Sequence, residues 1–195
     1  MAVILASKSP RRQELLRLLD VEFTVKTADI DETMNPSLPP EDEVARVSAE
    51  KAAAIAKTAA ADDVVISADT IVVAKGEVLG KPADEADAAR MLRMLSGDWH
   101  EVMTAVTVCR GDVSMTRVSR TKIRFRALSD AEIAAYIATK EPMDKAGSYG
   151  IQGKASVFAE ELHGDYFGVM GLPVCLLSQM LGEFGMNILG KEETV

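Results

Sequence analysis

Residues 2–19 read AVILASKSPRRQELLRLL, and the pattern changes halfway along this stretch. Residues 2–6 form a short apolar run, which is typical of a buried strand. Over residues 10–19 leucines recur at helical spacing, so a helix with one apolar face is expected there. Ser9 is placed to cap this helix, and Pro10 suits its first position. The chain therefore opens as a strand that passes directly into a helix.

The rest of the chain continues this alternation. Further strands are predicted at residues 21–25, 64–73, 102–110, 113–126 and 156–162. Further helices are predicted at residues 41–60, at residues 83–95, from a capping box at residues 129–132 to just before Pro142, and after Leu172-Pro173. Strands and helices in alternation, with a hairpin turning at Gly111-Asp112, indicate an α/β fold with a mixed sheet.

Composition narrows the class of protein. The 195 residues carry a net charge of −8, which argues against binding to a nucleic acid polymer but not against binding a small anion. Because no apolar run approaches the roughly 20 residues of a membrane span, no membrane partner is expected and a cytoplasmic location is the default. Cys109 and Cys175 both lie in apolar patterns, so both are expected to be buried and reduced.

The segment between the first strand and the first helix, SKSPRR, has the equipment of an anion site. A helix N-terminus has unsatisfied N–H groups and a partial positive charge, so it favours anions. Ser7 adds a hydroxyl, and Arg11 and Arg12 add forked cationic donors that match phosphate oxygens. The alternative is a simple N-cap with two solvated arginines. Two cations in a first turn oppose the helix dipole, however, which favours a phosphate or carboxylate ligand.

Carboxylates gather at two places. Residues 29–32, DIDE, could ligate a hard cation such as Mg²⁺, although taken alone they fit a solvated acidic loop better. Asp69 follows the apolar strand that starts at Val64, and ligands of α/β proteins tend to bind at the carboxyl ends of strands. A carboxylate within an apolar run is costly unless it is used, so we expect Asp69 to hold a metal, act as a general base or act as a nucleophile.

Three further polar side chains are candidates. Lys81 lies between a glycine and a proline, which suits a fixed loop that presents an ammonium group. Lys51 could equally be a solvated helix position. Gln152 lies in the glycine-rich run GIQGK at residues 150–154, where the backbone can approach a ligand closely and the amide can both donate and accept. A mobile surface loop is an equally good interpretation of that run.

Taken in order, these motifs resemble those of one protein family. The resemblance rests on Ser7-Lys8-Ser9-Pro10-Arg11-Arg12, Asp31-Glu32, Glu50-Lys51-Ala52, Ala68-Asp69-Thr70, Gly80-Lys81-Pro82, Ser96-Gly97, Asp144-Lys145-Ala146-Gly147, Gly150-Ile151-Gln152-Gly153 and Gly171-Leu172-Pro173. It spans about residues 2–185 and points to the Maf family of nucleoside triphosphate pyrophosphatases. Arg11, Thr70 and Gln152 match the specificity positions of the branch that hydrolyses dTTP and UTP.

The resemblance implies a fold, an assembly and a cofactor. Maf proteins share with the inosine triphosphate pyrophosphatases (Maf/Ham) a long mixed β-sheet with surrounding helices and a cleft between two lobes. Residues 1–195 are accordingly expected to form a single Maf-like domain. The family further implies a homodimer, a cytoplasmic location, a nucleoside triphosphate substrate and a divalent cation, which can be Mg²⁺, Mn²⁺ or Co²⁺.

The resemblance also assigns roles to residues. The triphosphate is expected to be held by Ser7, Arg12, Lys51 and Lys81. A metal is expected on Glu32 and Asp69, with Asp69 also accepting the proton of the attacking water. Two alternatives stay open: a phosphatase that uses Asp69 as a covalent nucleophile, although Ile71 stands where such enzymes place a second Asp, and a non-catalytic nucleotide-binding regulator of cell division.

Overall fold

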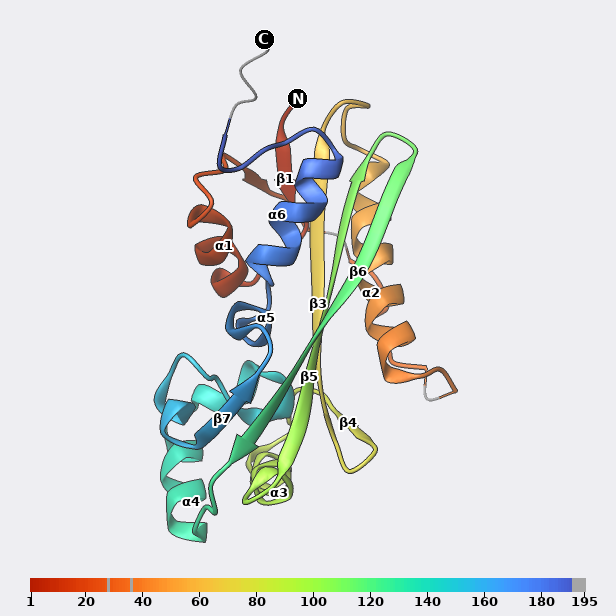
Figure 1. The fold of residues 1–195 in the computed structure, drawn as a ribbon. Coiled ribbons are helices and arrows are strands. Elements are labelled where there is room, and N and C mark those ends of the chain that lie inside the picture. The colour runs from red at the N-terminus through yellow and green to blue at the C-terminus, as the bar shows by residue number, and fades with distance from the viewer. Residues whose placement is uncertain (28, 36, 191–195) are drawn as a thin grey trace. The chain divides into compact units, whose positions relative to one another are not determined.

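The structure is a computed structural model that describes residues 1–27, 29–35 and 37–190 (Figure 1). Its chain divides into two compact units. Unit 1 consists of the described residues of Met1–Asp69, Thr104–Ser119 and Gly171–Val195, and unit 2 of Thr70–Met103 and Arg120–Met170. That residues 1–195 form a single domain, and that a cleft separates two lobes, stay predictions.

Within the described residues, the strands form a seven-stranded sheet in the order β2-β1-β3-β5-β6-β7, with β4 paired to β3. The strands are β1 (Val3–Leu5), β2 (Thr24–Val25), β3 (Val64–Ala74), β4 (Glu77–Leu79), β5 (Trp99–Arg110), β6 (Val113–Phe125) and β7 (Ala159–His163). Strand β1 pairs in parallel with β2 and β3, whereas β3–β4 and β6–β7 are antiparallel. The predicted α/β fold with a mixed sheet is therefore confirmed.

Unit 1 is built around β1 and three helices, α1 (Pro10–Arg17), α2 (Pro40–Ala56) and α6 (Val174–Glu183). Figure 1 shows α2 on one face of the sheet and α1 with α6 on the other. On the face covered by α2, Ala52 and Ile55 of the helix pack against Ile4, Val65 and Cys109 of three neighbouring strands. This packing places the middle of α2 directly over β3.

Unit 2 has its own core and its own helices, α3 (Glu85–Leu95), α4 (Asp130–Ala138) and α5 (Tyr166–Met170). Three short 3₁₀ turns, η1 (Glu141–Asp144), η2 (Ala146–Ser148) and η3 (Lys154–Val157), lie within and on either side of the glycine-rich stretch. The predicted capping box is confirmed, because Ser129 and Glu132 bond reciprocally to each other's backbone N–H groups. The predicted alternation along β6 is also confirmed, with Ile123 and Phe125 buried and Arg124 exposed.

Element boundaries differ from the expectations where local chemistry ends a pattern early. Helix α1 ends at Arg17 because Asp20, at φ = 50°, takes a left-handed conformation that a helix does not continue through. Helix α2 ends at Ala56, where the Thr58 hydroxyl donates to the carbonyl of Ile55 at 3.1 Å and satisfies a terminal acceptor. Ser9 is the N-cap residue of α1 as expected, but its hydroxyl makes no capping bond.

Several other expectations are corrected. Strand β4 and helix α5 were not anticipated, because three and five residues are too few to show a period. Strand β5 begins at Trp99 instead of residue 102, and β7 spans Ala159–His163 instead of residues 156–162. Cys109 is buried as predicted, but the prediction for Cys175 is wrong. Helix α6 turns Leu177, Met180 and Leu181 inward, which leaves Cys175 on its outer face.

A buried histidine gives unit 2 a pH-sensitive point. His100 Nε2 lies 2.8 Å from the hydroxyl of Tyr149, and the ring makes edge contacts with Phe125 and Tyr149. No hydrogen-bond partner for Nδ1 exists among the described residues. Burial lowers the pKa of His100 from 6.5 to about 4, against the smaller opposing effect of the charge of Asp98. The native ring therefore stays neutral at pH values at which the unfolded chain takes up a proton.

We expect acid to destabilise the protein through His100. The unfolded ring titrates near 6.5 and the native ring near 4, so this contribution to stability is complete above about pH 6.5 and is lost as pH falls toward about 4. Replacing His100→Gln removes the titration. The loss of unfolding free energy caused by the substitution should then be about 2 kcal/mol smaller at about pH 5 than at about pH 7.5 in urea titrations. An equal loss at both pH values would contradict this.

Candidate functional site

The candidate site in unit 1 begins at the C-terminal end of β1. Leu5, the last residue of β1, pairs with Ile66 of β3, and the amide of Ala6 then donates to the carbonyl of Ile66 at 2.7 Å. Beyond that point β3 continues without a parallel neighbour in β1. Ser7 follows directly and is buried, and its hydroxyl accepts a bond from the amide of Ser9 at 3.2 Å. The strand-to-helix junction predicted as an anion site therefore has its serine hydroxyl turned inward.

Asp69 lies in the middle of β3, which corrects the expectation that it ends a strand. Strand β3 runs from Val64 to Ala74 without a break, and only Asp69 and Thr70 interrupt its buried stretch at residues 64–72. A carboxylate at this position of β3 still lies at the end of a strand, but the strand that ends there is the neighbour β1. Asp69 is three residues past the last β1 pairing at Ile66. Its side chain is 15% exposed, so the carboxylate is largely withdrawn from water but accessible.

Lys51 brings two predicted carboxylates together. Its Nζ lies 2.8 Å from Asp69 Oδ1 and 3.0 Å from Glu32 Oε2. The lysine side chain is only 12% exposed, whereas that of Glu32 is 57% exposed. Lys51 comes from α2, Asp69 from β3 and Glu32 from the acidic loop, so three separate segments meet on one ammonium group. A solvated position for Lys51, the alternative left open by the sequence, is therefore wrong.

Arg12 extends the same cluster. Its Nε donates to the carbonyl of Gly171 at 2.8 Å and its Nη1 donates to Ser7 Oγ at 3.3 Å. Burial lowers the pKa of the Arg12 guanidinium, and the charges of Asp69 and Glu32 oppose that shift while Arg11 adds to it. A guanidinium remains protonated even so. Arg11, Glu32 and Asp69 are thus close enough to act electrostatically on Arg12, which joins the first helical turn to the carboxylates.

The acidic loop is held in place by residues that sequence reasoning missed. Arg46 donates two hydrogen bonds, of 2.9 and 2.5 Å, to the carboxylate of Glu43 and another, of 3.1 Å, to the carbonyl of Thr33. Glu43 is buried and accepts a bond from the amide of Asn35 at 2.7 Å. These bonds fasten the backbone just after Glu32 to α2. The signal was a Glu and an Arg three residues apart beside Val44 and Val47, on a face that ought to be apolar.

Buried hydroxyls tie the helix of Lys51 to the strand of Asp69. Ser67 Oγ donates to the carbonyl of Ser48 at 2.6 Å, and the two hydroxyls lie 3.2 Å apart. Ser48 Oγ also lies 2.9 Å from Thr107 Oγ1 of β5. Ser48 stands one turn before Lys51 on α2, and Ser67 stands two residues before Asp69 on the same face of β3. This second link between α2 and β3 supports the ion pair beside it.

The remaining predicted residues belong to unit 2 or to the acidic loop. Lys81 and Gln152 are exposed, and Thr70 is half-buried next to Asp69 in sequence. The loop of Lys81 is pinned by a bond from the amide of Gly147 to the carbonyl of Gly80, at 3.1 Å. In the acidic loop, Asp31 folds back onto Thr33. A hydrogen bond with the Thr33 side chain, and a second from the Thr33 amide at 2.9 Å, lower the pKa of the Asp31 carboxyl group.

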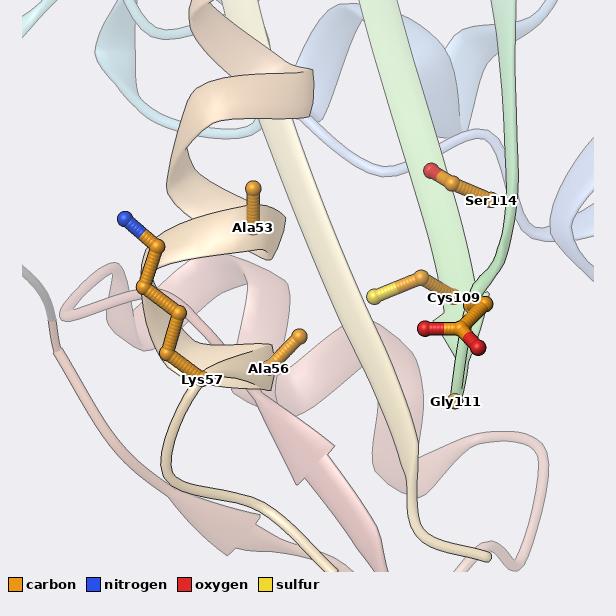
Figure 2. A pocket seen from close by; sticks show the side chains of 7 residues that line it. Ala53, Ala56, Lys57, Cys109, Gly111 and Ser114 are labelled. Carbon is orange, nitrogen blue, oxygen red and sulfur yellow. The ribbon is translucent and has the colours of Figure 1, made fainter. Parts of the chain in front are cut away.

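A separate hollow of unit 1 holds none of the predicted residues. Figure 2 shows it between the C-terminal half of α2 and the turn of the β5–β6 hairpin, with the thiol of Cys109 turned toward the helix. Ala53 and Ala56 line the helix side, and Gly111 and Ser114 line the hairpin side. Lys57 and Asp112 also line this hollow, but neither is a predicted site residue, and the predicted carboxylates Glu32 and Asp69 lie on Lys51 instead.

Glu32 and Asp69 are the two residues on which the family resemblance places a metal. Among the described residues, no group of three or more His, Cys, Asp and Glu side chains is arranged to hold a metal ion. Glu32 and Asp69 nevertheless share one cationic partner, so their oxygens converge on a common position. Mg²⁺ is commonly bound by one or two carboxylates together with water and substrate phosphates. The donor set therefore fits such an ion.

Comparison with known proteins places this arrangement in a family. The family model described as "Maf-like protein" matches residues 2–184. The chain belongs to the Maf family. Among curated proteins, a dTTP/UTP pyrophosphatase of Bacillus cereus (strain ATCC 10987 / NRS 248) is 46% identical over 186 residues, covering 95% of this chain and 91% of the relative. A dTTP/UTP pyrophosphatase of Bacillus mycoides is 45% identical and covers 95% of this chain and 97% of the relative.

Solved structures share the fold of this Maf protein at low sequence identity. A Ham1 protein of Staphylococcus aureus has a TM-score of 0.53 at 13% identity, covering 94% of this chain and 100% of that chain. A HAM1 protein of Coxiella burnetii has a TM-score of 0.51 at 17% identity with the same coverage. The expected likeness of the Maf fold to the Ham fold is therefore confirmed. None of the helices in the described residues is long and apolar enough to cross a membrane.

Proposed function

We propose that this Maf protein hydrolyses dTTP and UTP between the α- and β-phosphates, giving the nucleoside monophosphate and pyrophosphate. The observation that carries the proposal is the cluster in which Lys51 contacts both Glu32 and Asp69 while Arg12 bonds to Ser7. Cations that face carboxylates supply both halves of phosphoryl chemistry, charge neutralisation and a proton acceptor. The names of the curated relatives support the choice of dTTP and UTP as substrates.

Asp69 is the proposed general base. It accepts a proton from water as the water oxygen bonds to phosphorus, and the bond from phosphorus to the bridging oxygen breaks to release pyrophosphate. Lys51 orients the Asp69 carboxylate through the 2.8 Å contact and offsets charge that develops on the phosphate. Arg12 and Ser7 bind phosphate oxygens from the helix side. Lys81 of unit 2 is proposed as a further phosphate ligand.

Glu32 and Asp69 are the proposed ligands of a divalent cation, Mg²⁺, Mn²⁺ or Co²⁺. Such an ion lowers the pKa of bound water and neutralises phosphate charge. Lys51 contacts both carboxylates, so the side chains proposed to hold the ion are also oriented by a common cation. The bonds of Arg46 and Glu43 around Thr33 and Asn35 keep Glu32 within reach of that position.

Base selectivity is assigned to Gln152, Thr70 and Arg11, the positions that match the dTTP/UTP branch. A site that hydrogen-bonds a base rejects analogues that leave its polar groups unpaired. We therefore expect UTP and dTTP to be hydrolysed at least about 10²-fold faster than ATP and GTP, compared as kcat/KM in a pyrophosphate-release assay with Mg²⁺. Equal rates across the four nucleotides would refute the assignment. Binding without release of pyrophosphate would favour a regulator instead.

Two expectations about the whole protein stay predictions. The family resemblance implies a homodimer, which sedimentation of the purified protein would test. It also implies a cytoplasmic location, which fractionation of cells would test. Trapping of a phosphate on Asp69 would favour the phosphatase alternative, because the proposed reaction forms no bond between that carboxylate and phosphorus.

A further inference from the structure

The loop at residues 150–154 of unit 2 is fastened at both ends by one pair of side chains. At its C-terminal end, the amide of Lys154 donates to the two carboxylate oxygens of Glu141 at 3.1 and 3.2 Å. At its N-terminal end, the amide of Gly150 donates to the hydroxyl of Tyr136 at 3.1 Å. That hydroxyl in turn donates to Glu141 Oε1 at 3.0 Å. The loop is thus closed on a connected pair, Tyr136 and Glu141.

The backbone approaches these side chains so closely that the loop needs its glycines. A Cβ added at Gly153 would overlap the carboxylate of Glu141, and a Cβ added at Gly150 would lie 2.8 Å from Lys145 Cε. Lys145 is itself fixed, because its Nζ donates to the carbonyl of Glu141 at 2.6 Å. From the sequence, Gly150 and Gly153 were expected to let the backbone approach a ligand. In the structure they allow the side chains of Glu141 and Lys145 to approach the backbone closely.

Gln152 is presented at the centre of this fastened loop. Ile151 before it is buried in the core of unit 2, and the amide of Gly153 after it donates to the carbonyl of Gly150 at 2.9 Å. Gln152 alone of these three is exposed. The backbone of Gln152 is held in place by the buried side chain of Ile151 and by the hydrogen bonds of Gly150, Gly153 and Lys154. These contacts favour a fastened loop over the mobile surface loop that the sequence left as an alternative.

The carboxylate of Glu141 and the hydroxyl of Tyr136 do more than close the loop. A hydrogen bond from a backbone amide to a carboxylate is about twice as strong as a neutral one. Tyr136 packs edge-on against Phe158, with ring centroids 5.2 Å apart, so its hydroxyl is held by the core. Glu141 is thereby oriented by a rigid aromatic ring and acts on the residues flanking Gln152. Such an arrangement fixes a backbone position to within a small distance, which recognition of a base edge requires.

We propose that Glu141 and Tyr136 are positioning residues that set base selectivity by fixing the backbone of Gln152. The proposal rests on the proposed function, in which Gln152 reads the pyrimidine. Uracil and cytosine have the same size but present opposite donor and acceptor groups at positions 3 and 4 of the ring. Discrimination between UTP and CTP therefore depends on hydrogen bonding and not on shape, and a displaced Gln152 loses it.

The test compares UTP with CTP in two variants. Glu141→Ala removes the acceptor for Lys154, and Tyr136→Phe removes only the hydroxyl while keeping the ring. Each should lower the ratio of kcat/KM for UTP to that for CTP about tenfold, because small misplacements of a positioned group have effects of this order or larger. The change should fall mainly on KM. The same loss should appear in calorimetric affinities for the α,β-methylene analogues of UTP and CTP.

Two further variants separate positioning from general stability. Glu141→Gln keeps a carbonyl oxygen that can accept from Lys154, so it should recover part of the ratio lost in Glu141→Ala. Glu132→Ala removes a different carboxylate of unit 2, one on α4 that accepts a bond from the amide of Ser129 at 2.9 Å and pairs with Arg126. It should lower Tm as Glu141→Ala does, yet leave the UTP-to-CTP ratio unchanged. The double variant Tyr136→Phe/Glu141→Ala should lose little more than either single variant, because both act through one loop.

The outcomes separate this inference from the proposed function. If the wild-type protein releases pyrophosphate from UTP and dTTP while Glu141→Ala and Tyr136→Phe keep the wild-type ratio, the inference is overturned and the function stands. The inference is also overturned if Glu132→Ala lowers the ratio as far as Glu141→Ala does. If the wild-type protein neither hydrolyses a triphosphate nor binds the UTP analogue, both are overturned.

Discussion

Asp69→Asn should lower kcat for UTP by a factor of about 10² to 10⁴, the usual contribution of one general base. Asparagine has the same shape as aspartate and can still accept a bond from Lys51, which now lies 2.8 Å from Asp69 Oδ1. It cannot take up the proton of the attacking water. Steady-state release of pyrophosphate measures the loss. KM should change much less than kcat, because Arg12 and Ser7 remain to bind the phosphates.

The matched control for this variant is Asp112→Asn. Asp112 is exposed at the turn between β5 and β6 and lines the separate hollow of unit 1, so its substitution removes one negative charge at a place away from the Lys51 cluster. It should keep wild-type activity, and both variants should keep the wild-type circular dichroism spectrum. Wild-type turnover by Asp69→Asn would show that another group accepts the proton.

Lys51→Gln is expected to have the second largest effect, a fall of about 10² to 10³-fold in kcat/KM for UTP, similar to the loss of one preorganised donor in other active sites. The substitution removes the ammonium group that contacts both Glu32 and Asp69. Two carboxylates that had shared a positive charge are then left to repel each other. The position between them is changed for any cation or phosphate that binds there.

Lys57→Gln on the same helix is the matched control. Lys57 is exposed and is the C-terminal cap residue of α2, six residues after Lys51. It does not belong to the cluster of Lys51, Glu32 and Asp69. Its loss should leave kcat/KM within about twofold of wild type, as expected for a surface substitution away from the site. If Lys51→Gln behaves like Lys57→Gln, the contact between Lys51 and Asp69 has no part in turnover.

The fold was predictable from the sequence to the extent that each element has a clear period. The strand at residues 64–73 and the capping box at residues 129–132 follow from local pattern alone, and both are confirmed. Strand β4 and helix α5 were missed because they are short and depend on their neighbours. The exposure of Cys175 was misjudged because the first turn of α6 is apolar on all sides, and only tertiary packing decides which face is buried.

The candidate site was predictable as a set of residue types but not as a geometry. The sequence marks Asp69 because a carboxylate within an apolar run is costly. It does not reveal that Lys51 lies between Asp69 and Glu32, since that contact joins positions 18 and 19 residues apart through the packing of α2 on β3. The roles of Ser48 and Ser67 were likewise invisible, because serine hydroxyls in a helix and a strand belong to no motif. Glu43 and Arg46 left only the weak signal of a charged pair beside the buried Val44 and Val47.

The most direct test of the account is to identify the products formed from UTP in the presence of Mg²⁺. The proposed attack of water, with Asp69 as base and the triphosphate held by Lys51 and Arg12, breaks the bond between the α- and β-phosphates. The account therefore predicts UMP and pyrophosphate in equal amounts, resolved by anion-exchange chromatography of the reaction mixture. Formation of UDP and inorganic phosphate, or recovery of intact UTP, would contradict it.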